Sequence, residues 1–227
     1  MTSENLSENP PASNPLVERK REIRREFGAA RKARPAQERE RVSEQLLQQL
    51  SSLPEFAELL TMPATGCVAA YVSFAGEPGT DQIRHFASAS GIRLAMPIIR
   101  PDFTLDWAWD SVDTAPGRNY EGVPEPTGEV IAHGADGIVS LHCRIMLVPA
   151  LAVDAHGYRM GKGGGFYDRL LADLETHDAR PLLVAVVHDD EVVDTLPVED
   201  HDLPVDAILT PTQIIRVPGR RSYIPVV

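Results

Sequence analysis

Short apolar runs bounded by turn-forming residues recur from residue 67 onward. The run at 67–74 (CVAAYVSF) contains β-branched and aromatic residues and is followed by Gly76 and Pro78, which predicts a buried strand that leads into a loop. Further buried strands are predicted at 92–99, 144–152, 182–187 and 207–210. Residues 104–109 alternate apolar and polar side chains, which predicts a more exposed strand, and the turn-rich stretch 117–128 is expected to be irregular.

Helical periodicity marks the segments between these runs. Apolar residues recur at helical spacing from residue 16 to about residue 60, which predicts two helices, with Pro35 opening the second. Residues 81–90 and 166–175 predict two more helices. Strands that alternate with helices predict a three-layer α/β/α fold, in which helices cover both faces of a mainly parallel sheet.

Composition and charge narrow the class of protein. With 227 residues, 43% of them hydrophobic, the chain suits a disordered leader at 1–15 and one domain at 16–227. A net charge of −11 disfavours nucleic acid and anionic membranes as partners, and the chain has no apolar run long enough to cross a membrane. We therefore expect a soluble, cytoplasmic protein, by default a monomer. Cys67 and Cys143 are isolated in apolar surroundings, which predicts buried reduced thiols.

The sequence GKGGG lies between a predicted strand and a predicted helix. Glycines let backbone N–H groups approach an anion, and the following helix N-terminus adds partial positive charge. With Arg159 and Lys162 nearby, the loop formed by Gly161, Lys162, Gly163, Gly164 and Gly165 predicts a phosphate cradle. The spacing matches neither a Walker A motif nor GxGxxG, and a flexible connection is the alternative.

Other charged residues each allow two interpretations. Asp168, one turn into the helix, can bind a Mg²⁺ ion that bridges it to bound phosphates, or can simply compensate the helix dipole. Asp206 is either a second magnesium ligand or a turn residue. Lys20 and Arg24, four residues apart, can clamp a polyphosphate, belong to a solvated basic face, or form part of a nucleic-acid-binding arm. Glu77 can accept hydrogen bonds from a polar heterocycle or be an ordinary loop residue.

Four segments occur in the order typical of 5-formyltetrahydrofolate cyclo-ligases. They are the Lys20/Arg24 pair, SFAGEPGT, LVPALAVDAHGYRMGKGGGFYDRLL and LPVEDHDLPVDAILT. The chain resembles this family from residue 16 to about residue 210, and the third segment is the most specific. The resemblance implies a fold similar to that of CoA transferases and sugar-phosphate isomerases.

The resemblance also implies a reaction and its residues. ATP and Mg²⁺ would support closure of 5-formyltetrahydrofolate, which can carry a polyglutamate tail, to 5,10-methenyltetrahydrofolate, with release of ADP and phosphate. The implied ATP site comprises Lys20, Arg24, Arg159, Gly161, Lys162, Gly163, Gly164, Gly165, Phe166 and Tyr167, of which Arg159 and Lys162 would serve the phosphoryl transfer. Substrate contacts would be Val72, Glu77, Phe166 and Tyr167, and magnesium ligands would be Asp168 and Asp206. Some family members carry a second basic residue where this chain has Gly164.

Two other functions are compatible with the same residues. A sugar-phosphate enzyme on this fold would bind one phosphate and need no nucleotide, and a folate-binding module with an inactive site would bind without turnover. Requirement for ATP distinguishes the first from the cyclo-ligase, and turnover distinguishes the second.

Overall fold

The structure is a computed structural model that describes residues 14–119 and 122–220. Its α-helices are α1 (Pro15–Ala33), α2 (Ala36–Leu50), α3 (Pro54–Thr61), α4 (Asp81–Ala89), α5 (Gly134–Ser140) and α6 (Phe166–Leu174). Short 3-10 helices span Pro63–Thr65 (η1) and Asp189–Glu191 (η2). None of the helices in the described ranges is both long and apolar enough to cross a membrane.

The N-terminal helices differ from the prediction in number and in start. α1 already begins at Pro15, inside the predicted leader, because Asn14 caps it by accepting a hydrogen bond from the Leu16 backbone N–H at 3.0 Å. The rest of that leader, residues 1–13, lies outside the described residues. The predicted second helix is divided into α2 and α3, since Pro54 starts a new helix at its N1 position.

Thirteen strands occur in the described ranges. They are β1 (Cys67–Ala69), β2 (Arg93–Ile99), β3 (Leu105–Trp109), β4 (Gly117–Arg118), β5 (Pro124–Glu125), β6 (Ala132–His133), β7 (Cys143–Pro149), β8 (Ala152–Asp154), β9 (Arg159–Met160), β10 (Leu182–Val186), β11 (Val192–Val193), β12 (Ala207–Leu209) and β13 (Ile214–Arg216). Eight of them form the main sheet in the order β13-β12-β10-β7-β1-β2-β3-β6. The central pairs from β12 to β2 are parallel, and the three pairs at the edges are antiparallel.

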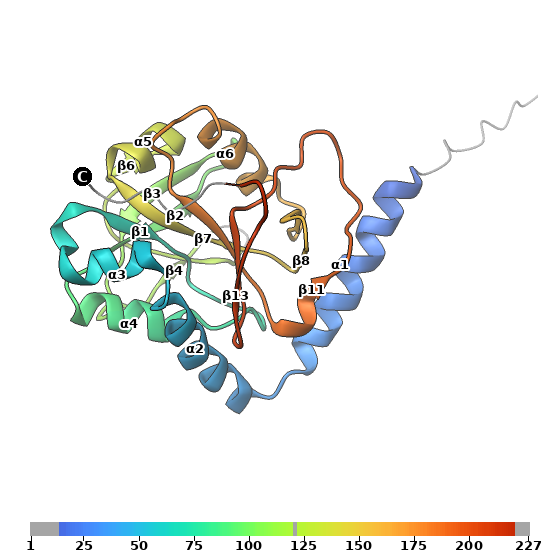
Figure 1. The fold of residues 1–227 in the computed structure, drawn as a ribbon, viewed down its shortest axis with the longest axis horizontal. Helices are drawn as coiled ribbons and strands as arrows, with labels where there is room; N and C mark the ends of the chain where they lie inside the picture. Colours follow the sequence, from blue (N-terminus) through green and yellow to red (C-terminus); the bar gives the residue numbers. More distant parts are fainter. Residues whose placement is uncertain (1–13, 120–121, 221–227) are drawn as a thin grey trace, which may run out of the picture.

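Helices cover both faces of this sheet, which confirms the predicted α/β architecture (Figure 1). One core packs α2, α3 and α4 against the sheet, and the other core packs α5 and α6 against the opposite face. Cys67 and Cys143 are free thiols buried in the second core, on neighbouring strands. α1 lies outside these layers and contacts β8 and β9 through a small cluster centred on Ile23.

Two strand predictions are corrected by the tertiary structure. β3 is not exposed, because it lies between β2 and β6 and under α5, where Trp107 is buried and donates to the Gly134 carbonyl at 3.0 Å. The run predicted as one strand at 144–152 divides after Pro149, and Ala152 begins β8 in a separate sheet of order β11-β8-β9. The predicted irregular stretch at 117–128 contains the small β4/β5 pair.

Candidate active site

A tight hairpin presents the glycine loop to the carboxyl end of the sheet. In the turn between β8 and β9, the buried Asp154 carboxylate accepts hydrogen bonds from the backbone N–H groups of His156 and Tyr158 at 2.9 and 3.0 Å. Gly157 has φ +86°, and a Cβ there would lie 2.8 Å from the Val205 carbonyl oxygen, so the turn requires glycine. This hairpin fixes Arg159, and with it the start of the loop that follows.

The loop backbone is shaped by left-handed glycines. Gly163 has φ +102° and Gly165 φ +73°, and Gly165 is also the N-cap of α6. A Cβ at Gly164 would lie 2.5 Å from the Phe166 ring, so a larger residue at this position requires that ring to move. The first turn of α6 therefore opens directly from the glycine loop, as the sequence predicts.

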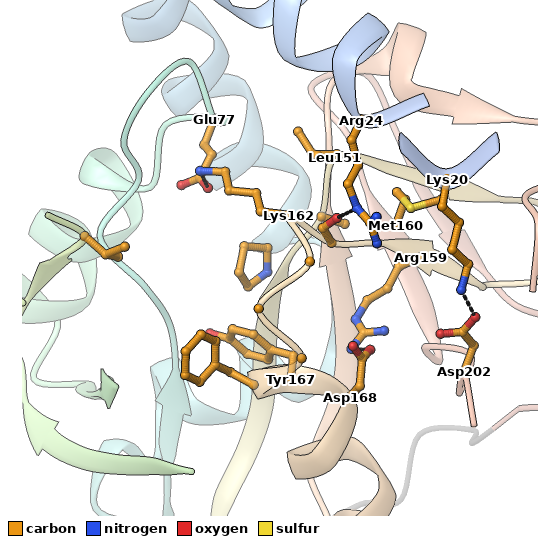
Figure 2. Close-up of a pocket in the computed structure, with 18 of the residues that line it drawn as sticks. Lys20, Arg24, Glu77, Leu151, Arg159, Met160, Lys162, Tyr167, Asp168 and Asp202 are labelled. Atoms are coloured by element: carbon orange, nitrogen blue, oxygen red, sulfur yellow. Dashed lines mark hydrogen bonds and ion pairs between the residues drawn. The ribbon is translucent and has the colours of Figure 1, made fainter. Parts of the chain in front are cut away.

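A cavity of about 400 Å³ lies over this loop. Its walls come from α1, from β9 and the glycine loop, from the first turn of α6, and from the segment that precedes β12. Figure 2 shows the cations Lys20, Arg24 and Arg159 on one side of the cavity, with Glu77 and Tyr167 on the other. The structure thus brings most of the residues predicted for ATP and substrate into one place.

The two α1 cations are held by different partners. The Arg24 Nε donates to the Gly161 carbonyl at 3.0 Å, which ties α1 to the glycine loop. The Lys20 Nζ lies 2.7 Å from both Glu199 Oε2 and Asp202 Oδ2. Burial lowers the pKa of Lys20, but its hydrogen bonds to these carboxylates outweigh that effect and leave the pKa raised. Lys20 is therefore a charged, positioned group rather than part of a solvated face.

Arg159 and Asp168 form an ion pair at the start of α6. Arg159 Nη2 donates to Asp168 Oδ1 at 2.8 Å, and the Arg159 side chain is buried while the Asp168 side chain is 37% exposed. Only one Asp168 oxygen is engaged in this hydrogen bond, so the carboxylate keeps acceptor capacity toward the cavity that it lines.

Across the cavity, Lys162 reaches away from the loop to Glu77. The Lys162 Nζ lies 2.7 Å from Glu77 Oε1 and 3.7 Å from the centre of the Phe74 ring. Glu77 is buried, and its other carboxylate oxygen accepts a hydrogen bond from the Phe74 backbone N–H at 3.1 Å. Lys162, which was predicted to bind phosphate, thus forms an ion pair with Glu77, which was predicted to bind the substrate.

A narrow, mostly apolar recess of about 70 Å³ continues from the cavity beside Glu77. Val72, Phe166 and Tyr167 line it, together with proline and aliphatic side chains from β2, β5 and β7. Burial and the nearby Glu77 carboxylate raise the pKa of Tyr167, so its hydroxyl stays protonated and can donate a hydrogen bond. A flat heterocycle with a few polar edges suits such a slot.

Asp206 is not brought to the cavity. It precedes β12 and so lies at the amino edge of the parallel strands, where its buried carboxylate accepts from Arg180 at 2.6 and 2.9 Å. Arg180 also pairs with Glu175, which is about 10 Å along the α6 axis from Asp168. The two predicted magnesium ligands are therefore at opposite ends of α6, and no cluster of three or more metal-binding side chains occurs in the described ranges.

Sequence reasoning missed three residues that organise the site. Glu199 and Asp202 belong to the segment LPVEDHDLPVD, but their function depends on Lys20, which is 179 and 182 residues away in the chain. Arg31 lines the cavity and forms a buried ion pair with Glu191. A lysine that must be held near anions needs buried carboxylate partners, but the chain offers too many acidic residues for the sequence alone to identify them.

Comparison with known proteins agrees with the resemblance seen in the sequence. The model of the 5-formyltetrahydrofolate cyclo-ligase family matches residues 16–211. The 5-formyltetrahydrofolate cyclo-ligase of Mycolicibacterium smegmatis is 35% identical over 149 residues, which cover 63% of this chain and 73% of that protein. The Escherichia coli enzyme of the same name is 30% identical over 149 residues, which cover 65% and 79%.

A solved structure supports the same conclusion. The NMR structure of Aquifex aeolicus 5,10-methenyltetrahydrofolate synthetase superimposes with a TM-score of 0.70 at 28% identity, covering 91% of this chain and 96% of that chain. The family match, the similar enzymes and the shared fold confirm the resemblance inferred from the motifs. The chain is therefore a ligase that belongs to the 5-formyltetrahydrofolate cyclo-ligase family.

Proposed function

We propose that the cavity binds ATP and 5-formyltetrahydrofolate side by side and closes the folate to its 5,10-methenyl form. The observation that carries the proposal is the single cavity shared by the glycine loop with its cations and by the recess beside Glu77. Two different ligands, one anionic and one a flat heterocycle, fit these two ends. A sugar-phosphate enzyme would need the first end but not the second.

The reaction needs ATP because a formamide is a poor electrophile. In the proposed mechanism the formyl oxygen attacks the γ-phosphate, and the bond from that phosphorus to the bridging oxygen of ADP breaks. N10 of the folate then attacks the activated formyl carbon, the C–O bond breaks with loss of phosphate, and the N10 proton leaves to solvent. No covalent protein intermediate is required. The chain's part is orientation and charge neutralisation.

The cations are suited to the phosphates by position and charge state. Arg159 and Lys20 are buried and are held by carboxylates, while Arg24 lies against the Gly161 carbonyl. Backbone N–H groups of the glycine loop and of the first turn of α6 would add uncharged donors. Lys162 would leave Glu77 and turn to the phosphates when ATP and folate enter.

Asp168 is suited to bind magnesium at this site, whereas Asp206 is not. Mg²⁺ on a nucleotide is bound through one or two carboxylates, with phosphate oxygens and water completing its shell, so one protein ligand is sufficient. Asp168 lines the cavity with a partly exposed carboxylate, whereas the Asp206 carboxylate is buried in its pair with Arg180. The ion would neutralise charge that develops on the phosphates.

Glu77 would hold the folate. Its buried carboxylate would accept hydrogen bonds from the amine and ring N–H groups of the pterin, in a slot that Val72 and Tyr167 help to form. Phe166 would cover the ring system from the side of α6. This arrangement would place the formyl group toward the phosphates.

The test is to follow the absorbance of the methenyl product when the purified protein is mixed with 5-formyltetrahydrofolate, with and without MgATP. We expect a rise that requires MgATP, with Asp168→Asn losing most turnover and Lys162→Ala chiefly raising the KM for ATP. Lys32→Ala, on the exposed end of α1, is the matched control and should behave as wild type. Absence of any rise with folded protein would reject the proposed activity and favour a binding module.

A further inference from the structure

In the described part of the chain, the hydroxyl group of Tyr71 is buried without a hydrogen-bond partner. Tyr71 follows β1 at the carboxyl end of the main sheet and is 5% exposed. Its backbone is fixed, because the Tyr71 carbonyl accepts a hydrogen bond from Thr80 Oγ1 at 2.7 Å. A buried tyrosine hydroxyl normally has a partner, since it loses its water on burial, so this hydroxyl is available to a bound molecule.

Tyr71 contributes to the apolar recess beside Glu77. Its ring packs in the core between the sheet and helices α2, α3 and α4, which keeps the side chain from turning out to solvent. Burial and the nearby Glu77 carboxylate raise the pKa of Tyr71 well above its ordinary value, although Arg31 acts in the opposite direction. The hydroxyl therefore stays protonated at neutral pH and remains a hydrogen-bond donor.

Glu77 and Tyr71 give the recess two hydrogen-bonding groups of opposite kind. The Glu77 carboxylate is an acceptor, and the Tyr71 hydroxyl is a donor near it. One edge of a pterin carries the complementary pattern, because the 2-amino group and N3–H are donors and the adjacent 4-oxo group is an acceptor. A pterin whose two donors meet Glu77 thus presents its 4-oxo oxygen beside that carboxylate, where Tyr71 offers a donor.

In the described ranges, the other polar side chains that line the recess are Glu125 and Tyr167. Glu125 offers an acceptor, which does not suit an oxo group, and it already accepts from the Ile99 backbone N–H at 3.3 Å. Tyr167 is a donor, but it is half-buried and also lines the larger cavity, where water reaches it. Tyr71 lines the recess and not the larger cavity, so it is the donor that depends on an occupant of the recess.

We propose that the Tyr71 hydroxyl donates a hydrogen bond to the 4-oxo oxygen of the pterin and so selects 4-oxo over 4-amino pteridines. The assignment rests on the proposed function, which places the pterin in the recess. A 4-amino group has its lone pair delocalised into the ring, so it cannot accept from Tyr71. With such a ligand the hydroxyl hydrogen stays unpaired in a mostly apolar recess. Tyr71 is thus a specificity-determining contact.

Tyr71→Phe removes the hydroxyl and keeps the ring. Calorimetric titration measures the affinity of both proteins for 5-formyltetrahydrofolate and for its 4-amino-4-deoxy counterpart, without relying on turnover. We expect Tyr71→Phe to bind the 4-oxo ligand about ten-fold more weakly, because the buried oxo group loses its donor. The affinity for the 4-amino ligand should change less than about two-fold, and the affinity for ATP should not change. Equal losses for the two folates, or no loss for the 4-oxo ligand, would overturn the assignment.

Two further tyrosines serve as comparisons. Tyr158→Phe is the matched control, because Tyr158 lies in the turn between β8 and β9 and lines neither the cavity nor the recess. It should bind both folates as wild type does. Tyr167→Phe tests the competing donor, and a selective loss of the 4-oxo ligand in Tyr167→Phe but not in Tyr71→Phe would refute the proposal.

Stability separates a binding role of Tyr71 from a structural one. Without ligand, Tyr71→Phe should unfold at the same urea midpoint as wild type or at a higher one, since no bond within the protein is lost. A hydroxyl that served the fold alone would lower the midpoint and leave folate affinity unchanged, which would contradict the assignment.

The two proposals fail in different ways. If wild type shows no turnover with MgATP but Tyr71→Phe selectively weakens binding of the 4-oxo folate, the proposed activity is wrong and the assignment of Tyr71 stands. If wild type turns over 5-formyltetrahydrofolate and Tyr71→Phe binds it equally well, only the assignment of Tyr71 is wrong.

Discussion

Replacement of Arg31 by methionine should be among the most destabilising single changes on α1. The Arg31 guanidinium meets both oxygens of Glu191 at 2.7 Å, and the two side chains are 2% and 1% exposed. Arg31 Nη2 also donates to the Ala150 carbonyl at 2.5 Å, so the pair joins α1, η2 and the segment after β7. Burial lowers the pKa of Arg31, yet the hydrogen bond to Glu191 leaves it raised, so the buried guanidinium stays charged.

Arg31→Met would leave Glu191 as a buried charge without its main partner. Loss of one partner of such a pair costs about 3–5 kcal/mol, which is a third or more of the stability of a marginal domain. Glu191→Gln should cost a similar amount, and the double variant should cost clearly less than the sum because no buried charge remains. Since α1 carries Lys20 and Arg24, the KM for ATP should rise as well.

Urea unfolding followed by circular dichroism measures these free energies of unfolding. Arg19→Met is the matched control on the same helix, because Arg19 pairs with Glu22 at 3.1 Å while both side chains are more than half exposed. It should cost less than about 0.5 kcal/mol. A loss below about 1 kcal/mol for Arg31→Met, or additive costs in the double variant, would refute the reasoning.

Three further predictions concern single side chains. Gly163→Ala should lose about 1–2 kcal/mol of unfolding free energy, because φ is +102° there. An added Cβ at Gly161 would meet no other atom within 4 Å, so Gly161→Ala should be tolerated, and equal urea midpoints for the two variants would contradict this reasoning. Tyr71→Phe should leave the free energy of unfolding unchanged or raise it by up to about 1 kcal/mol, since the buried Tyr71 hydroxyl has no hydrogen-bond partner in the described ranges. A clear loss of stability would show that the hydroxyl does have a partner. Burial raises the pKa of Asp202, but hydrogen bonds from Lys20 and the Glu199 backbone outweigh burial and leave that pKa lowered. The stability that Asp202 contributes is therefore present above about pH 4 and is lost as pH falls through the folded-state pKa. Between about pH 5 and pH 2, the urea midpoint should therefore fall less in Asp202→Asn than in wild type. An equal fall in the two proteins would exclude this contribution of Asp202.

The sequence was sufficient for elements whose signals are local. The glycine loop followed by α6 needs only glycine at left-handed positions and apolar residues at helical spacing, and both are visible in GKGGGFYDRLL. The buried central strands are apolar runs because parallel strands are covered on both faces. Pro54 gave a signal that was overlooked, since a proline after a helix-ending serine pair starts a new helix at N1.

The remaining features depend on distant partners. The alternating pattern of β3 indicates one exposed face, but Asp106 on that face is held by Arg100 at 2.5 Å and by His133 at 2.8 Å, so its polar character does not imply exposure. Asp206 precedes a strand in the chain, and only the strand's direction in the sheet shows that this is the amino edge, away from the cavity. Sequence position alone does not distinguish these cases.

The pair of Lys162 with Glu77 joins the two halves of the candidate site. Lys162 is 45% exposed, so its release to solvent or to phosphate costs little, whereas Glu77 is 5% exposed and cannot regain water when the lysine leaves. A ligand that draws Lys162 away therefore leaves a buried carboxylate that needs another hydrogen-bond donor, and the amine and ring N–H groups of a pterin are donors of that kind. Occupation of the glycine loop and occupation of the recess are thus expected to favour each other through this one ion pair.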